Sequence, residues 1–221
     1  MEANQISPDD IRRERLRRER DYYLSEEGYL DFIRDSGACP DAQKEPHGRY
    51  AQDIIHWNGE PDPENKEQII YKYKMVLWPR GSFKTQGFDI GYVAWLIARN
   101  PDIRILVTSE TDNLSSDIVE KVKDIIDSEW YRERFGVHRG KKWKTGEFTS
   151  GLLSKERSAK KEPTLKAGSV GTVETGMHWD VVVMDDVCSQ KNTQTPEAIE
   201  VTQTITKQQT HQLQFQRWFF D

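Results

Sequence analysis

The chain has 221 residues, a hydrophobic fraction of 35%, a charged fraction of 31% and a net charge of −5. This length accommodates one α/β domain with polar extensions, and the charge excludes a protein coated uniformly with basic residues. The sequence contains no apolar run near the ~18 residues of a membrane span, and its N-terminus lacks the apolar core of a secretory signal. Cys39 and Cys188 have no zinc-like spacing, so we expect a reducing, intracellular environment.

Residues 1–67 are predicted to form a helical and irregular N-terminal region. Ser7 can cap a helix over 8–24, because Pro8 suits the first turn and the acids at 9–10 face the positive end of the helix dipole. This helix is mostly Arg and Glu, so we expect a solvated arm. A second helix is predicted near 25–36, and residues 37–67 are expected to be irregular around a short segment at 49–57.

Residues 68–200 alternate between strand and helix patterns. Such alternation predicts the α/β class, with a mostly parallel sheet flanked by helices. Apolar runs predict strands at 69–78, 103–110, 164–170 and 179–187, and helical periodicity predicts helices at 85–99 and 113–136. Residues 201–221 are predicted to be a polar C-terminal tail.

The segment "PRGSFKT", at 79–85, joins the first predicted strand to a helix, where a phosphate-binding loop is expected. Lys84 then places a point charge on the β- and γ-phosphates, and the Thr85 hydroxyl holds Mg²⁺. Gly81 is the one glycine in this segment. Phe83 must therefore either adopt a left-handed conformation, at a cost of about 1–2 kcal/mol, or follow a different path.

The string "VVVMDD", at 181–186, is an apolar strand followed by two acids. In doubly wound sheets, ligands bind at the carboxyl ends of the strands. The phosphate loop follows its own strand at the same edge. We therefore expect Asp185 and Thr85 to share one metal ion, and Asp186 to orient or deprotonate a water molecule.

With "ARNPDIRILVTSETDNLS" and "KEPTLKAGSVGTVETGMHWD", these motifs resemble the ATPase domain of the large terminase subunit of tailed bacteriophages over residues 69–200. The resemblance implies a P-loop NTPase fold of the RecA/ASCE type. It implies an ATP-binding loop made of Arg80, Gly81, Ser82, Phe83, Lys84 and Thr85, in which Arg80 reaches the γ-phosphate. It also implies that Asp185 is the magnesium-associated acid and that Asp186 is the catalytic carboxylate, a position more often occupied by Glu. Gln52 is a candidate for contacting adenine.

The same resemblance implies an ATP- and Mg²⁺-dependent motor that moves double-stranded DNA into the procapsid in the host cytoplasm. It implies a homo-oligomeric ring at the procapsid vertex, with the portal protein and the small terminase subunit as partners. Because the family's nuclease domain has no counterpart here, we expect a partial large subunit. It also lacks the family's coupling motif, so the activity of the isolated chain stays open.

Residues 132–166 hold eleven lysines or arginines against four acids. They predict either a surface for the DNA backbone, bound without regard to sequence, or a solvated loop. Two other functions remain open. One is a different P-loop DNA translocase with helicase-like character. The other is an inactive fragment that acts as a scaffold.

Overall fold

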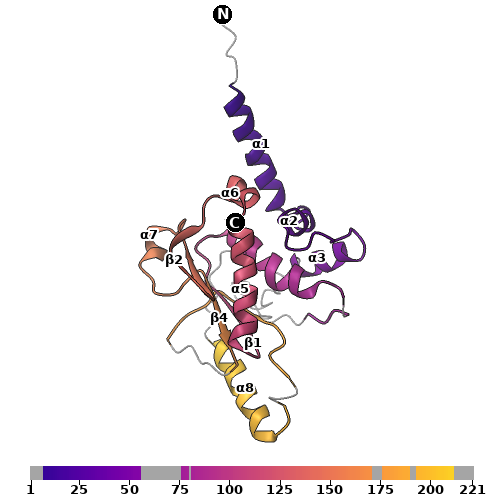
Figure 1. The fold of residues 1–221 in the computed structure, drawn as a ribbon, viewed down its shortest axis with the longest axis vertical. Helices are drawn as coiled ribbons and strands as arrows, with labels where there is room; N and C mark the ends of the chain where they lie inside the picture. Colours follow the sequence, from indigo (N-terminus) through magenta and orange to yellow (C-terminus); the bar gives the residue numbers. More distant parts are fainter. Residues whose placement is uncertain (1–6, 56–75, 80, 171–175, 190–192, 212–221) are drawn as a thin grey trace, which may run out of the picture.

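The computed structural model describes residues 7–55, 76–79, 81–170, 176–189 and 193–211. Residues 208–211 are described through their backbone alone. The centre of the molecule is a five-stranded sheet in the order β2-β3-β4-β1-β5, flanked by helices (Figure 1). The strands are β1 (Ile105–Ser109), β2 (Arg139–Lys144), β3 (Glu147–Ser150), β4 (Leu165–Ser169) and β5 (Val181–Met184). The helices are α1 (Pro8–Tyr23), α2 (Tyr29–Asp35), α3 (His47–Ile55), η1 (Thr85–Tyr92), α4 (Val93–Arg99), α5 (Asp112–Asp127), α6 (Glu129–Phe135), α7 (Lys155–Ser158) and α8 (Pro196–His211).

The α/β class is confirmed, and the sheet is mixed. β1 pairs in parallel with both β4 and β5, as the alternating pattern predicts. The basic segment adds the hairpin β2–β3, which joins β4 antiparallel and was not predicted. Every residue of β1 is buried, whereas Val183 is the one buried residue of β5. β5 is less buried than β1 because it lies at an edge of the described sheet.

Several predicted helices have different limits. The helix predicted at 113–136 divides at Ser128. The backbone of Ser128 is extended, with ψ 150°, like that of Ser7, which caps α1 with ψ 151°. The Ser128 side chain accepts a hydrogen bond from the Tyr131 amide. A serine at this position caps a second helix better than it continues the first. The short segment expected at 49–57 within the irregular stretch 37–67 is helical in its described part, because α3 covers it as far as Ile55 and buries its apolar face.

The first predicted strand and the predicted end of the ATPase core are not seen as expected. Most of the strand predicted at 69–78 lies outside the described residues, and residues 76–79 are not in a strand. Position 200/201, taken as the end of the ATPase core, falls inside α8 and is not the boundary of an element.

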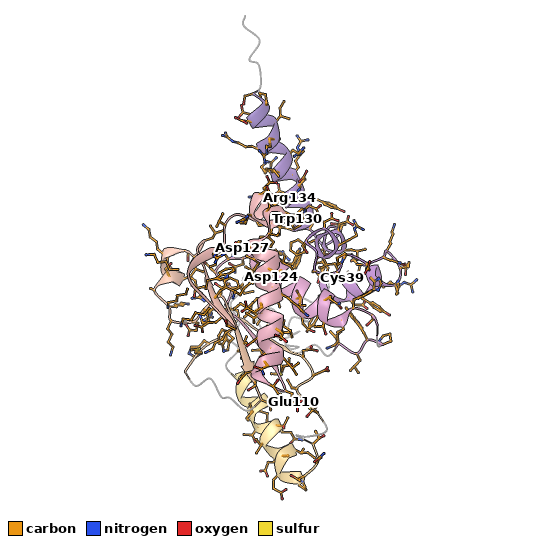
Figure 2. The ribbon with its side chains drawn as sticks, in the orientation of Figure 1. Cys39, Glu110, Asp124, Asp127, Trp130 and Arg134 are labelled. Atoms are coloured by element: carbon orange, nitrogen blue, oxygen red, sulfur yellow. The ribbon has the colours of Figure 1, made fainter. Side chains whose placement is uncertain are left out.

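The helix α1 projects from the body as the predicted solvated arm (Figure 1). It has no buried residue, and ion pairs join Glu14 to Arg17 and Arg18, and Arg17 to Asp21, along its exposed surface. Two ion pairs tie it to α6: Arg12 with Glu133 and Glu19 with Arg134, each at 2.6 Å. Figure 2 shows Arg134 and Trp130 at the base of the arm. Among the described helices, none is both long and apolar enough to cross a bilayer.

A buried ion pair joins the amino ends of β1 and β5. Asp180 accepts hydrogen bonds from the backbone amide of Arg104 at 2.8 Å and from its Nε at 2.9 Å, and a third from Nη2 at 2.5 Å. The two side chains are 3% and 14% exposed. This pair therefore helps to fix how β1 and β5 are aligned.

We predict that Asp180→Ala lowers the free energy of unfolding by about 3 kcal/mol, because it leaves the Arg104 guanidinium buried without its partner. The control is Glu147→Ala, which removes an exposed pair with Lys144 and should change the denaturation midpoint little. Urea denaturation followed by circular dichroism compares the two variants. Equal losses would contradict a structural role for the Asp180 pair.

Candidate functional site

The segment predicted to bind phosphate leads into a helix of unusual geometry. The predicted helix at 85–99 is confirmed, but its first part, η1, is a π-helix and only α4 is a regular α-helix. Inside the protein, the Tyr29 hydroxyl donates to the Gly87 carbonyl at 2.7 Å. This bond satisfies a backbone acceptor of the widened turn, and π-turns of this kind are frequent at functional sites.

The loop before η1 contains two residues with left-handed backbone. Gly81 has φ 80° and Phe83 has φ 57°. Phe83 therefore adopts the first of the two predicted alternatives and accepts a cost of about 1–2 kcal/mol. The Phe83 ring lies 5.1 Å from the His47 ring of α3, and the Ser82 hydroxyl donates to the Pro79 carbonyl at 2.6 Å. These contacts hold the strained loop against α3.

The loop meets the acidic end of β5. Lys84 donates through Nζ to Asp185, 101 residues along the chain, and the Thr85 hydroxyl lies 3.5 Å from the other carboxylate oxygen of Asp185. The predicted convergence of these three side chains is therefore present in the structure. Lys84 is about one third exposed, and Asp185 is buried. An ammonium, a hydroxyl and a carboxylate thus share one partly open site.

Asp89, a residue that the sequence did not single out, also faces this site. Its Oδ2 lies 3.8 Å from Lys84 Nζ, and the residue is 1% exposed. In a regular α-helix, residues three or four apart share a face, and a residue five positions on is turned away. The wider π-turn brings position five back over the first. The five-residue spacing of Lys84 and Asp89 therefore predicts a shared site only when the π-helix is already known.

Burial and neighbouring charges set the protonation of this cluster. Burial, followed by the negative charge of Asp185, raises the pKa of Asp89 to about 8. Burial lowers the pKa of Lys84, but the hydrogen bond to Asp185 and the charges of Asp89 and Asp185 outweigh it, so its pKa lies above the ordinary value. At neutral pH the site therefore holds a charged lysine beside a protonated Asp89.

The other predicted site residues have separate outcomes. Asp186 is exposed and has a left-handed backbone, with φ 46°. Arg80 lies outside the described residues. Gln52 is not among the residues that line the nearby pocket, and its side-chain amide faces the Glu26 carbonyl at 3.5 Å.

The residues present fit a magnesium ion that is shared with phosphate. Thr85 and Asp185 offer one hydroxyl and one carboxylate at the same place. Mg²⁺ is usually held by one or two protein oxygens together with substrate phosphates and water. Within the described ranges, no group of three or more His, Cys, Asp and Glu side chains is arranged to hold a metal.

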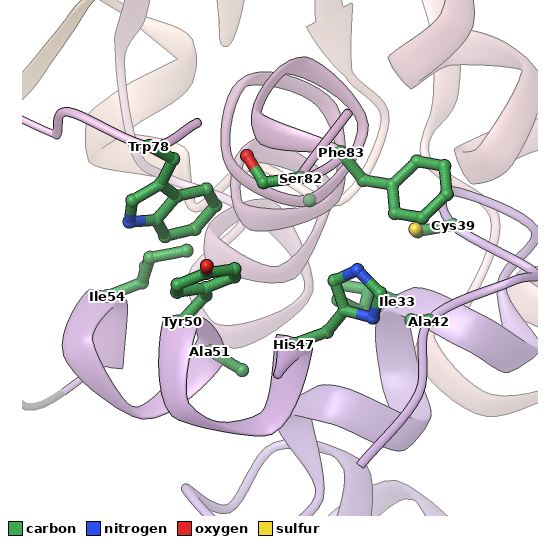
Figure 3. Close-up of a pocket in the computed structure, with 11 residues that line it drawn as sticks. Ile33, Cys39, Ala42, His47, Tyr50, Ala51, Ile54, Trp78, Ser82 and Phe83 are labelled. Carbon is green, nitrogen blue, oxygen red and sulfur yellow. The ribbon is translucent and has the colours of Figure 1, made fainter. Parts of the chain in front are cut away.

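An aromatic pocket lies beside the loop (Figure 3). Its cavity volume is only about 10 Å³, the space of roughly one water molecule, and Figure 3 shows Tyr50 and His47 of α3 on one side and Trp78 and Phe83 on the other. The rings of Tyr50 and Trp78 are stacked with centroids 4.7 Å apart. A flat ligand would therefore enter this pocket only if these rings moved apart.

The basic segment forms the hairpin β2–β3 and the turn around α7. Its exposed lysines are Lys141, Lys142, Lys144, Lys155, Lys160 and Lys161. Lys144 pairs with Glu147 at 3.2 Å, whereas Arg157 is buried and donates to the Asp102 and Pro163 carbonyls. The segment is therefore an ordered surface in which Arg157 has a structural role.

We predict that Asp89→Asn raises the free energy of unfolding at pH 8 by an amount on the order of a few kcal/mol. The folded protein keeps a proton on Asp89 that the unfolded chain releases above about pH 4. Stability from this group is therefore lost as the pH rises from about 4 to about 8, and Asn removes that loss. Urea titrations of both proteins at several pH values measure the difference, which should be small at pH 4. A difference that does not change with pH would contradict the burial of a titrating carboxyl.

Comparison with known proteins leaves the site to be interpreted from its own geometry, because no protein-family model and no curated protein matches the sequence.

Proposed function

We propose that this protein binds ATP with Mg²⁺ and hydrolyses it as the ATPase module of a viral DNA-packaging motor. The observation that carries the proposal is the meeting of Lys84 and Thr85 with Asp185, from segments 100 and 101 residues apart. A lysine in a loop that leads into a helix, opposite an acid at the end of a strand, is the arrangement that the proposed P-loop NTPase site requires. The resemblance of residues 69–200 to large terminase subunits supports the choice of motor.

Each side chain has a distinct part in the proposed reaction. Lys84 leaves Asp185 and neutralises charge on the phosphates, as does Arg80 in the proposed loop, while Thr85 and Asp185 hold Mg²⁺. The bound metal supplies positive charge that stabilises the transferring phosphoryl group. In the absence of ATP, the contact between Lys84 and Asp185 satisfies both charges, so ligand binding exchanges one set of ionic contacts for another.

The aromatic pocket supports a nucleoside triphosphate as the ligand. Ser82, Phe83 and Gly87 belong both to the phosphate loop region and to the pocket lining. In this proposal the rings of Tyr50 and Trp78, which stack on each other in this structure, move apart to admit the base, and the ribose connects the base to phosphates at the loop. In this proposal, the ring of Tyr50 takes the place that the sequence assigned to Gln52.

The exposed lysines of the hairpin support DNA as the partner. Lys141, Lys142, Lys155, Lys160 and Lys161 form no ion pair with another described residue. Contacts from such lysines to phosphate give binding that tolerates any sequence and weakens with salt. The oligomeric ring, the portal protein and the small terminase subunit belong to the same proposal.

We predict that Lys84→Ala weakens ATP binding in the presence of Mg²⁺ by about 10- to 100-fold, because a charged hydrogen bond is worth about 1.5–3 kcal/mol. Calorimetric titration measures the affinity. Lys44→Ala, which removes an exposed lysine outside the site, is the control and should bind like the wild type. Unchanged affinity in Lys84→Ala would refute the loop assignment. A wild-type protein that binds no ATP would favour the scaffold function.

We predict that the double variant Lys141→Gln/Lys142→Gln weakens binding to a random-sequence DNA duplex. The magnitude of the slope of log K against log salt should fall by up to about 2, because a phosphate contact that is lost no longer releases counterions on binding. Fluorescence anisotropy at several salt concentrations measures the slope. Lys44→Gln/Lys121→Gln removes the same charge elsewhere and should bind like the wild type. Equal slopes in all three proteins would show that the hairpin does not contact DNA.

A further inference from the structure

The helix η1 holds Asp89 in a fixed position against α2. Two residues before Asp89, the Gly87 carbonyl accepts a hydrogen bond from the Tyr29 hydroxyl. Two residues after it, Gly91 lies so close to α2 that a Cβ atom in its place would come within 2.7 Å of the Ile33 side chain. Because α2 contacts η1 on both sides of Asp89, the backbone of this residue has little room to move.

Lys84 lies between two acids that do not share it equally. Its ammonium group donates to Asp185, whereas Asp89 Oδ2 is 3.8 Å away, beyond hydrogen-bond range. This Oδ2 atom is buried and accepts no hydrogen bond from any described residue. A buried oxygen without a donor is unfavourable. A shift of about 1 Å would bring Lys84 Nζ within hydrogen-bond distance of it.

Two cations compete for Asp185 in the proposed nucleotide site. Asp185 and Thr85 are the residues that would hold Mg²⁺, but in this structure one carboxylate oxygen of Asp185 accepts the hydrogen bond from Lys84. Two positive charges on one carboxylate repel each other, and partial burial strengthens that repulsion. Lys84 must therefore leave Asp185 when Mg²⁺ is held there. Its three N–H donors allow it to contact phosphate and a second protein acceptor at once.

We propose that Asp89 is a positioning residue, the acceptor that receives Lys84 when Asp185 holds Mg²⁺. This inference rests on the proposed nucleotide site. One N–H of Lys84 is donated to Asp89 Oδ2, so the remaining N–H groups are directed at phosphate oxygens. A carboxyl group keeps an oxygen that can accept this hydrogen bond whether or not it carries a proton. The π-turn supplies the second acceptor, because it returns the fifth residue after the lysine to the lysine's side.

The experiment measures the binding of ATP with Mg²⁺ by calorimetry at pH 7. Asp89→Ala removes the acceptor and should weaken binding about tenfold, the loss of one hydrogen bond to a charged group. Asp89→Asn keeps a carbonyl oxygen at the same place and should lose less than about threefold. Asp124→Ala, which removes an exposed carboxylate from α5, is the matched control and should bind like the wild type. A loss in Asp89→Asn as large as that in Asp89→Ala would overturn the inference.

A double-mutant cycle separates an action through Lys84 from a role in shaping η1. If Asp89 acts by holding Lys84, it has nothing to hold once the lysine is absent. Lys84→Ala/Asp89→Ala should then bind ATP within about twofold of Lys84→Ala alone. A carboxyl that only shapes η1 would cost the same affinity in both backgrounds, and that result would contradict the proposal. Asp89→Leu, which fills the space that water could enter in Asp89→Ala, is carried through the same cycle and should give the same result.

The inference and the proposed function fail in different ways. If Lys84→Ala weakens ATP binding and neither Asp89→Ala nor Asp89→Leu does, the nucleotide site stands and Asp89 has no part in positioning the lysine. If calorimetry detects no ATP binding to the wild-type protein, the proposed function fails and the inference fails with it.

Discussion

The contact between Lys84 and Asp185 is the constraint on which the functional part of this structure depends. It joins a strained loop to the end of β5, and the position of β5 is fixed in turn by its pairing with β1 and by the buried Arg104–Asp180 pair. A buried carboxylate is unfavourable without a cation beside it. The lysine therefore stabilises the closed arrangement and is also the group that a phosphate ligand would take over. The Lys84 ammonium group thus contributes both to the stability of the fold and to the binding of a ligand.

Much of the fold could be predicted from the sequence, because burial leaves a regular pattern. The apolar runs at 103–110 and 164–170 became the parallel strands β1 and β4, and Ser7 caps α1 as expected. The convergence of Lys84 and Asp185 could also be predicted, since parallel strands present their carboxyl ends at one edge. Phe83 adopts the left-handed conformation, one of the two alternatives that the sequence left open.

The remaining features depend on tertiary context that local patterns do not contain. The role of Asp89 follows from the π-turn of η1, where one hydroxyl from α2 satisfies a carbonyl of the widened helix. The hairpin β2–β3 was missed because β2 (RGKKWK) and β3 (EFTS) each contain one large apolar residue, Trp143 and Phe148, and so show no alternating apolar pattern.

The lysines of β2 have a consequence that is independent of DNA. β2 is an edge strand of the described sheet, and an edge strand has unpaired backbone groups that can template pairing with another copy of the chain. Charged side chains along such an edge repel a second copy and keep the protein from aggregating by strand addition. The basic hairpin is thus explained in part by colloidal stability. Neutralising it would be expected to shorten the time that concentrated protein stays monodisperse, even in a solution that contains no nucleic acid.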